Sequence, residues 1–288
     1  MRKYLSATIF SIFPALAFPD THFFERDFID GCVEGIGSVK DQQNRFLMAI
    51  GASEQLLELY SNTTDALHAN YTYRNIICSD ALEYVQENPE ILPNFITEQP
   101  LSISAFNIMY NLQNSYMIAG MKGMDGASLA TYFEYNAALY EALQAPYCKL
   151  FATADLSNQE TVVFEATIEA QSKMDLNLIK KLLDFSYNSI NKFIESRNQG
   201  EKLNTFKPIF FDIARREQLE MKFYEHVYNR STDISETINL FYILEGQRQG
   251  TNEDYCKASS FYFDAIATMP GKEGNLYREL VLHNMFQF

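Results

Sequence analysis

The chain has 288 residues, of which 47% are hydrophobic and 14% aromatic, and its formal net charge is −14. This apolar content suffices for a folded core and excludes general disorder, and the length suits one large domain or two small ones. An acidic surface repels phosphate backbones and anionic lipid head groups, which excludes nucleic acid and membrane surfaces as preferred partners and weakly favours a basic protein partner.

Residues 1–17 have the three parts of a secretory signal. Arg2 and Lys3 precede an uncharged apolar run, and a small-x-small pattern ends at Ala17. The run is too short to span a bilayer, for which a helix needs about 20 residues. We expect cleavage after Ala17 and export of a soluble mature chain, 18–288, to the periplasm or the extracellular space; the alternative is a core helix of a cytosolic protein. Cleavage leaves 21 basic against 37 acidic residues, a net charge of −16.

Two segments carry a family resemblance. CVEGIGSVKD begins at Cys32, and ICSDALEYVQENPEILP surrounds Cys78 and includes Asn-Pro-Glu at 88–90. This order resembles small periplasmic immunity proteins that neutralise amidase toxins of type VI secretion, in which two cysteines precede a helix that ends near an Asn- or His-Pro-Glu element. The likeness covers the first third of the chain and lacks that family's third cysteine. It implies an inhibitor or immunity role, which we keep among the candidates without assigning the chain to the family.

Helical periodicity dominates the sequence. Apolar residues mostly recur every three or four positions between turn-forming clusters. We predict an all-α fold with eight or nine helices and no substantial sheet, as a multi-helix bundle or as stacked antiparallel helical pairs. A proline-rich stretch near residues 87–100 is a candidate boundary inside an otherwise single helical domain.

Individual segments support this prediction. One apolar stripe predicts a helix from Leu176, Ile179, Leu183, Ile190 and Ile194. A second stripe consists of Phe206, Phe210, Ile213, Tyr224 and Val227. The segment VFEATIE at 163–169 alternates as a strand would, but the capping-box pattern of Ser157 and Glu160 before it favours a helix.

Motifs for catalysis and metal binding are sparse. Ser189 and Lys192 have a spacing that brings an amine to a hydroxyl, but the companion motifs of penicillin-recognising enzymes are missing. Glu279 and His283 share a helical face and could offer two metal ligands, although a plain surface pair is favoured. Glu225 next to His226 lacks the spacing of di-iron sites. We expect no metal and no cofactor, and the catalytic residues stay unknown.

Carboxylates and aromatic clusters leave two further alternatives open. Two carboxylates about 5 to 10 Å apart could hydrolyse a glycosidic bond, but a solvated helix end is favoured for Glu195 and Arg197. The clusters TINLFYILEG at 237–246 and SSFYFDAIATM at 259–269 could line a ligand pocket or form an interface hot spot. At helical spacing such aromatic residues more often form core.

The chain has four cysteines, at positions Cys32, Cys78, Cys148 and Cys256. An even number in an exported protein favours disulfides, and four cysteines allow three pairings. Cys148 and Cys256 share a Tyr-Cys-Lys setting, and Cys32 and Cys78 are close in sequence. We predict these two pairs as disulfides.

Three classes of function are compatible with these observations. The first is an exported helical binding protein such as an inhibitor, an immunity factor or an adaptor of the cell envelope, favoured because catalytic motifs are missing. The second is a helical hydrolase that uses dispersed carboxylates on cell-wall or extracellular polymers. The third is a structural part of an envelope assembly. A deep cleft with two facing carboxylates would favour the hydrolase, a flat aromatic patch with an acidic rim would favour binding, and long exposed seams would favour assembly.

Overall fold

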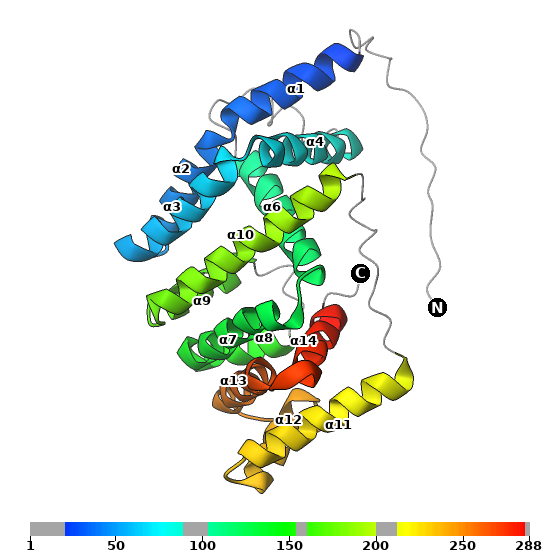
Figure 1. Ribbon diagram of the computed structural model, residues 1–288. Helices are drawn as coiled ribbons and strands as arrows, with labels where there is room; N and C mark the ends of the chain where they lie inside the picture. Colours follow the sequence, from blue (N-terminus) through cyan, green and yellow to red (C-terminus); the bar gives the residue numbers. More distant parts are fainter. Residues whose placement is uncertain (1–20, 89–102, 154–159, 200–211, 286–288) are drawn as a thin grey trace, which may run out of the picture.

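The computed structural model describes residues 21–88, 103–153, 160–199 and 212–285 (Figure 1). In these ranges the chain forms thirteen helices and no strand, so the expected all-α class is confirmed and the expected number of eight or nine helices is wrong. The difference arises where short breaks divide a helical run. At Asn70 one helix ends, and the Asn70 side chain accepts a hydrogen bond from the Tyr73 N–H and caps the next helix.

The helices and their bounds follow the labels of Figure 1. They are α1 (Thr21–Gly35), α2 (Gly37–Ala49), α3 (Glu54–Ala69), α4 (Tyr71–Glu87), α6 (Ile103–Lys122), α7 (Gly126–Ala142), α8 (Ala145–Thr153), α9 (Glu160–Gln171), α10 (Leu176–Asn198), α11 (Ile213–Arg230), α12 (Ile234–Leu244), α13 (Asn252–Thr268) and α14 (Gly271–Met285). The predicted signal at 1–17, Ser157 and most of the candidate boundary at 87–100 lie outside the described residues.

Short polar side chains start many of these helices. Each accepts a hydrogen bond from a backbone N–H of the first turn, which would otherwise have no partner. Thr251 and Asp254 form a full capping box at the start of α13. The capping residues are Ser53, Asn70, Asp125, Asp175, Asp212, Asp233 and Thr251.

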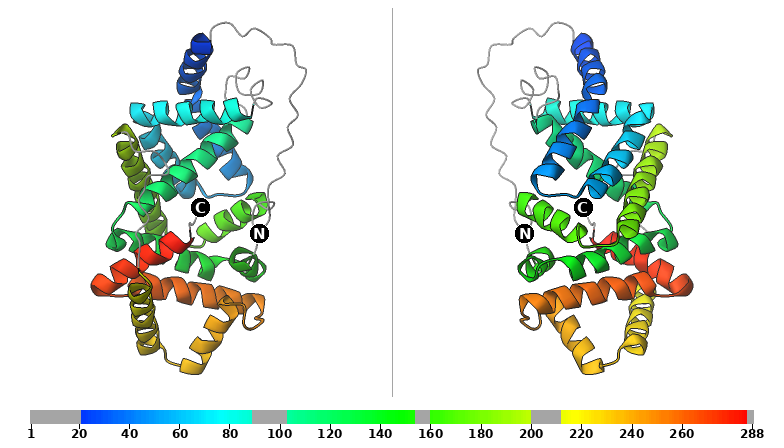
Figure 2. Two further views of the ribbon diagram at one scale, coloured as in Figure 1. Left: turned by 90° about the vertical axis from the view of Figure 1, so that its right-hand side faces the viewer. Right: turned by 90° about the vertical axis from the view of Figure 1, so that its left-hand side faces the viewer.

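The helices stack along one long direction of the molecule (Figures 1 and 2). α1 to α4 lie at one end, α11 and α12 lie at the other, and α6 packs against α10 between them. Tyr116 on α6 stacks on Phe193 of α10 in the core near α1 and α4, with ring centroids 4.5 Å apart. Met121 and Phe185 on the same two helices belong to a second core with α7, α11, α13 and α14. The two long helices therefore connect both halves.

The two predicted apolar stripes agree to different degrees with the burial that the structure shows. In α10, Ile179, Leu183, Ile190 and Ile194 are buried as predicted, and only Leu176 at the first turn is exposed. The second stripe is right for Val227, which is buried, and wrong for Ile213 and Tyr224, which are exposed; the buried face of α11 consists of Leu219, Phe223 and Val227. Phe206 and Phe210 lie outside the described residues. The segment VFEATIE lies in α9, which confirms helix over strand.

Candidate functional site

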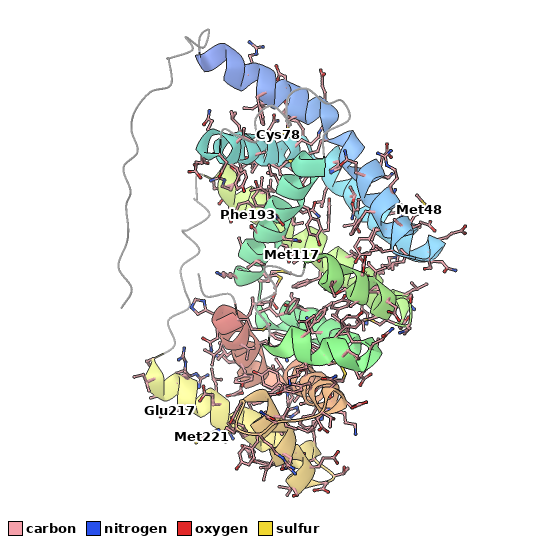
Figure 3. All side chains as sticks on the ribbon, turned by 180° about the vertical axis from the view of Figure 1, so that it is seen from behind. Met48, Cys78, Met117, Phe193, Glu217 and Met221 are labelled. Atoms are coloured by element: carbon pink, nitrogen blue, oxygen red, sulfur yellow. A yellow bond between two sulfur atoms is a disulfide. The ribbon has the colours of Figure 1, made fainter. Side chains whose placement is uncertain are left out.

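The four cysteines form the two predicted pairs. Cys32 on α1 is bonded to Cys78 on α4, with Cα atoms 5.8 Å apart, and Cys148 on α8 is bonded to Cys256 on α13, with Cα atoms 5.0 Å apart. Figure 3 shows Cys78 between the first helices of the chain. Cys32, Cys78 and Cys148 are almost fully buried. No described cysteine is free, so the described chain offers no thiol as a nucleophile.

The Ser-Lys spacing on α10 does not form a catalytic pair. Ser189 is fully buried, and its hydroxyl lies 2.8 Å from the Phe185 carbonyl oxygen and 2.9 Å from the Met124 sulfur. Lys192 is exposed on the same helix. The hydroxyl therefore has its partners in the core, and no hydrogen bond joins it to Lys192.

The glutamates of both Glu-His pairs bind groups other than the neighbouring histidine. Glu279 accepts a hydrogen bond of 2.9 Å from the Gly126 N–H at the start of α7, and burial raises the pKa of its carboxyl. Glu225 forms an exposed ion pair with Lys222, and His226 lies 3.5 Å from the Thr268 hydroxyl. Across the described side chains, no group of three or more His, Cys, Asp or Glu residues is placed to hold a metal ion.

The expectation of a solvated helix end is right for Glu195 and wrong for Arg197. Glu195 is exposed. The Arg197 guanidinium donates to the buried carboxylate of Asp80 on α4 at 2.5 Å, and the Tyr116 hydroxyl donates to the other carboxylate oxygen at 2.6 Å. This network joins α4, α6 and α10 in the core. Sequence spacing could not reveal it, because its members are 36 and 117 positions from Asp80.

A cleft with a volume of about 590 Å³ opens between α11, α12, α13 and α14. Leu280, Val281 and Met285 of α14 form part of its wall. We call it the aromatic cleft and define it by Glu220, Phe223, Tyr224, Phe241, Glu245, Tyr262 and Tyr277. Phe241 and Tyr262 come from the two aromatic clusters of the sequence, which therefore line a cleft and do not only fill core.

The rings of the aromatic cleft surround Phe223. Its centroid lies 4.5 Å from Tyr277 in a stacked arrangement, and 5.7 Å from Tyr262 and 6.2 Å from Phe241 in edge contacts. Tyr224 lies 5.6 Å from Phe241 and is 37% exposed. The contacts hold the rings in fixed orientations, and Tyr224 presents part of its ring to solvent.

Two carboxylates give this cleft an acidic field. Burial together with Glu245 and Glu220 raises the pKa of Tyr224. Burial, followed by smaller contributions that include Glu220, also raises the pKa values of Tyr262 and Tyr277. All three phenols are therefore neutral at physiological pH, and the two charged groups among the described lining residues are both negative.

Exposed apolar side chains gather around the same helices. Of the twelve large apolar side chains that are exposed in the described ranges, seven belong to α11, α12 and α14. Scattered exposed apolar residues are normal for a protein surface, but a local concentration marks an interaction site. The seven are Ile213, Met221, Tyr224, Tyr228, Ile234, Tyr242 and Met285.

A second cavity, of about 660 Å³, lies between the end of α7, the start of α12 and α13. We call it the acidic groove; its charged lining is Glu141, Arg230, Asp233, Glu236, Glu253, Lys257 and Asp264. Several of these groups have structural partners. Asp233 caps α12, Asp264 pairs with Arg230 at 2.6 Å, and Glu141 accepts from the Ser260 hydroxyl.

Comparisons with protein-family models, with curated proteins and with solved structures find no match for this chain. The description of the protein therefore rests on its own structure. It is an all-α, disulfide-bonded protein with an aromatic cleft at one end, and two carboxylates line this cleft. In the described ranges, no helix combines the length and the apolarity that crossing a membrane requires.

Proposed function

We propose that this chain is an exported helical binding protein, of the inhibitor, immunity-factor or adaptor type, that engages a protein partner through the aromatic cleft. The observation that carries the proposal is the coincidence of three features on α11, α12 and α14: fixed aromatic rings, two carboxylates and a concentration of exposed apolar side chains. Aromatic anchors in a cleft are the side chains that contribute most to protein interfaces.

Sequence and charge support the proposed compartment and the proposed kind of partner. The signal pattern at residues 1–17 and two disulfide pairs support export to the periplasm or another oxidising extracytoplasmic space. A mature charge of −16 supports a partner with a basic surface and opposes nucleic acid. Long-range attraction of this kind weakens with added salt.

Site-specific photo-crosslinking tests the proposal with a matched control. Tyr228 on α11 and Tyr84 on α4 are both tyrosines and both 42% exposed, but they lie in opposite halves of the molecule. A photoreactive phenylalanine analogue at Tyr228 should capture one dominant partner in the native host, and the same analogue at Tyr84 should not. Capture from Tyr84 alone, or the same products from both positions, would contradict the proposal.

A hydrolase that uses the acidic groove is the second candidate. It is favoured by one observation, namely that carboxylates from three helices and a loop converge on this cavity. Glu141, Glu236 and Glu253 are the carboxylates there that neither cap a helix nor form an ion pair in the described ranges, and of these Glu141 accepts from the Ser260 hydroxyl. Turnover of a cell-wall polymer that is lost in Glu236→Gln or Glu253→Gln would support the hydrolase and oppose a pure binding role.

A further inference from the structure

We propose that the aromatic cleft is a receptor for a lysine or arginine side chain, presented by a basic segment of the protein partner. The inference rests on the proposed binding function and deepens it, because it names the chemical group that the cleft recognises. It is carried by the combination of aromatic rings and carboxylates in a single cavity, among whose described lining residues there is no cation.

The rings provide the first part of the recognition. An ammonium or guanidinium group is attracted to the face of an aromatic ring when it lies within about 6 Å of the ring centroid. Phe241 and Tyr262 are half-buried, and Tyr224 is more exposed, so an entering side chain can reach them. The methylene stem of a lysine or arginine can pack on Leu244, Val281 and Met285, which line the same cleft.

The carboxylates provide the second part. Glu220 lies on α11 and Glu245 directly follows α12, and both carboxylates act electrostatically on Tyr224. Neither forms an ion pair in the described ranges; Glu245 accepts only from the Gln247 side-chain amide, at 2.9 Å. Two negative charges beside neutral rings favour a positive ligand and disfavour a neutral or an acidic one.

The two cavities differ in the cations that lie at them. In the acidic groove, Arg230 and Lys257 belong to the lining, and Arg230 already pairs with Asp264. At the aromatic cleft, Arg216 donates to the Asn284 side chain at one edge, 3.3 Å away, and is not part of the lining. The acidic groove therefore contains its own countercharges, and the described lining of the aromatic cleft contains none.

Methionine-methyl NMR tests this inference without a known partner. Met285 lines the cleft, whereas Met48 on α2 is equally a surface methionine in the other half of the molecule (Figure 3). The probe is a ten-residue peptide of alternating glycine and lysine, and its control is the same peptide with every lysine acetylated. We expect saturable shifts of the Met285 methyl with the lysine peptide, at least tenfold weaker binding of the acetylated peptide, and no shift of Met48.

Matched variants assign the charges. The double substitution Glu220→Gln with Glu245→Gln should weaken binding of the lysine peptide at least tenfold. Glu217→Gln removes the same kind of charge from the exposed part of α11 outside the cleft lining and should change the affinity less than twofold (Figure 3). An unchanged fold is checked by the helical signal in circular dichroism.

Three results would overturn the inference. They are equal binding of the acetylated peptide, unchanged binding by the double glutamine variant, and tighter binding of a free quaternary ammonium such as choline than of the peptide. Each of these is independent of the crosslinking experiment at Tyr228. If the partner captured at Tyr228 binds with the same affinity after substitution of Glu220 and Glu245, the proposed function would still hold and the inferred cation site would be wrong.

Discussion

Asp80 is a buried charge that the fold satisfies completely. Its side chain is 7% exposed, and its two oxygens accept from the Arg197 guanidinium and from the Tyr116 hydroxyl. Arg197 is more accessible, at 26%. Removing one member of such a network leaves a charge without its partner, which costs more than the intact pair contributes.

We predict that Asp80→Ala lowers the free energy of unfolding by about 2 to 3 kcal/mol, because Arg197 and Tyr116 both lose their acceptor. Chemical denaturation measures the change. The control is Glu225→Ala, which breaks the exposed pair with Lys222 and should have no measurable effect. Equal effects of both substitutions would show that the network does not hold α4 to α10.

His68 makes stability depend on pH. Its ring lies 6.3 Å from Tyr73 in a stacked arrangement, and burial lowers its pKa from the usual 6.5 to about 4, with Asp65 opposing and with Arg74 and Lys40 assisting. The unfolded chain therefore binds a proton between these values that the folded chain does not bind. Stability due to this group is complete above about pH 6.5 and is lost as the pH falls towards 4.

The loss should reach up to about 3 kcal/mol at the acidic end of this window. His68→Phe keeps a ring against Tyr73 and removes the titration. We expect the free energies of unfolding of the wild type and of this variant to change in parallel with pH above pH 6.5. Below pH 6.5 the wild type should lose stability more steeply than the variant. Parallel curves from pH 7 to pH 4 would contradict the account of His68.

At the scale of the helix, close approach of α6 and α10 depends on a missing side chain. A Cβ atom on Gly120 would overlap the backbone carbonyl of Ser189. Gly31 in α1 has open space around the same position. The two glycines therefore respond in opposite ways to the same substitution.

We predict that Gly120→Ala lowers the free energy of unfolding by about 2 to 3 kcal/mol, because the long helices must separate. Gly31→Ala should raise it by up to about 1 kcal/mol, since alanine favours the helix and nothing must move. Thermal denaturation of both variants is the measurement. A stabilising effect at Gly120 would mean that α6 and α10 are packed less closely than described.

Helices such as α10 are predictable from sequence because their buried face repeats without interruption. α11 shows the limit of this reasoning: Ile213 and Tyr224 share a helical spacing with Val227, but the helix buries Val227 together with Leu219 and Phe223 and leaves Ile213 and Tyr224 exposed. Helix number was underestimated because a single capped position, as at Asn70, ends a helix without a long turn. The helical spacing of apolar residues alone does not determine which of them pack against a neighbouring helix.

At the scale of the whole molecule, the disulfide pairs were accessible from sequence and the cleft was not. The shared setting of Cys148 and Cys256 indicated their pairing. The aromatic cleft collects residues from Glu220 to Met285, and its carboxylates carry no local motif. Only the arrangement of α11 to α14 brings Glu220 and Glu245 to the same rings. The aromatic clusters were the one signal that pointed to this region.

Export is a property of the whole chain and lies outside the described residues. We predict a mature N-terminus at Phe18, because the apolar run ends in the Ala15-x-Ala17 pattern. Intact-mass measurement of the protein from the extracytoplasmic fraction checks this. Protein that keeps residues 1–17 and is found only in the cytosol would exclude export.

The central claim is that the end of the molecule formed by α11 and α12 is the binding surface. Hydrogen exchange of the protein with and without the partner captured at Tyr228 tests it most directly. We predict slower exchange in the α11 segment around Glu220 and Tyr224 and at the end of α12, with α2 and α3 unchanged. Protection confined to α2 and α3, with unchanged exchange in α11 and α12, would contradict it.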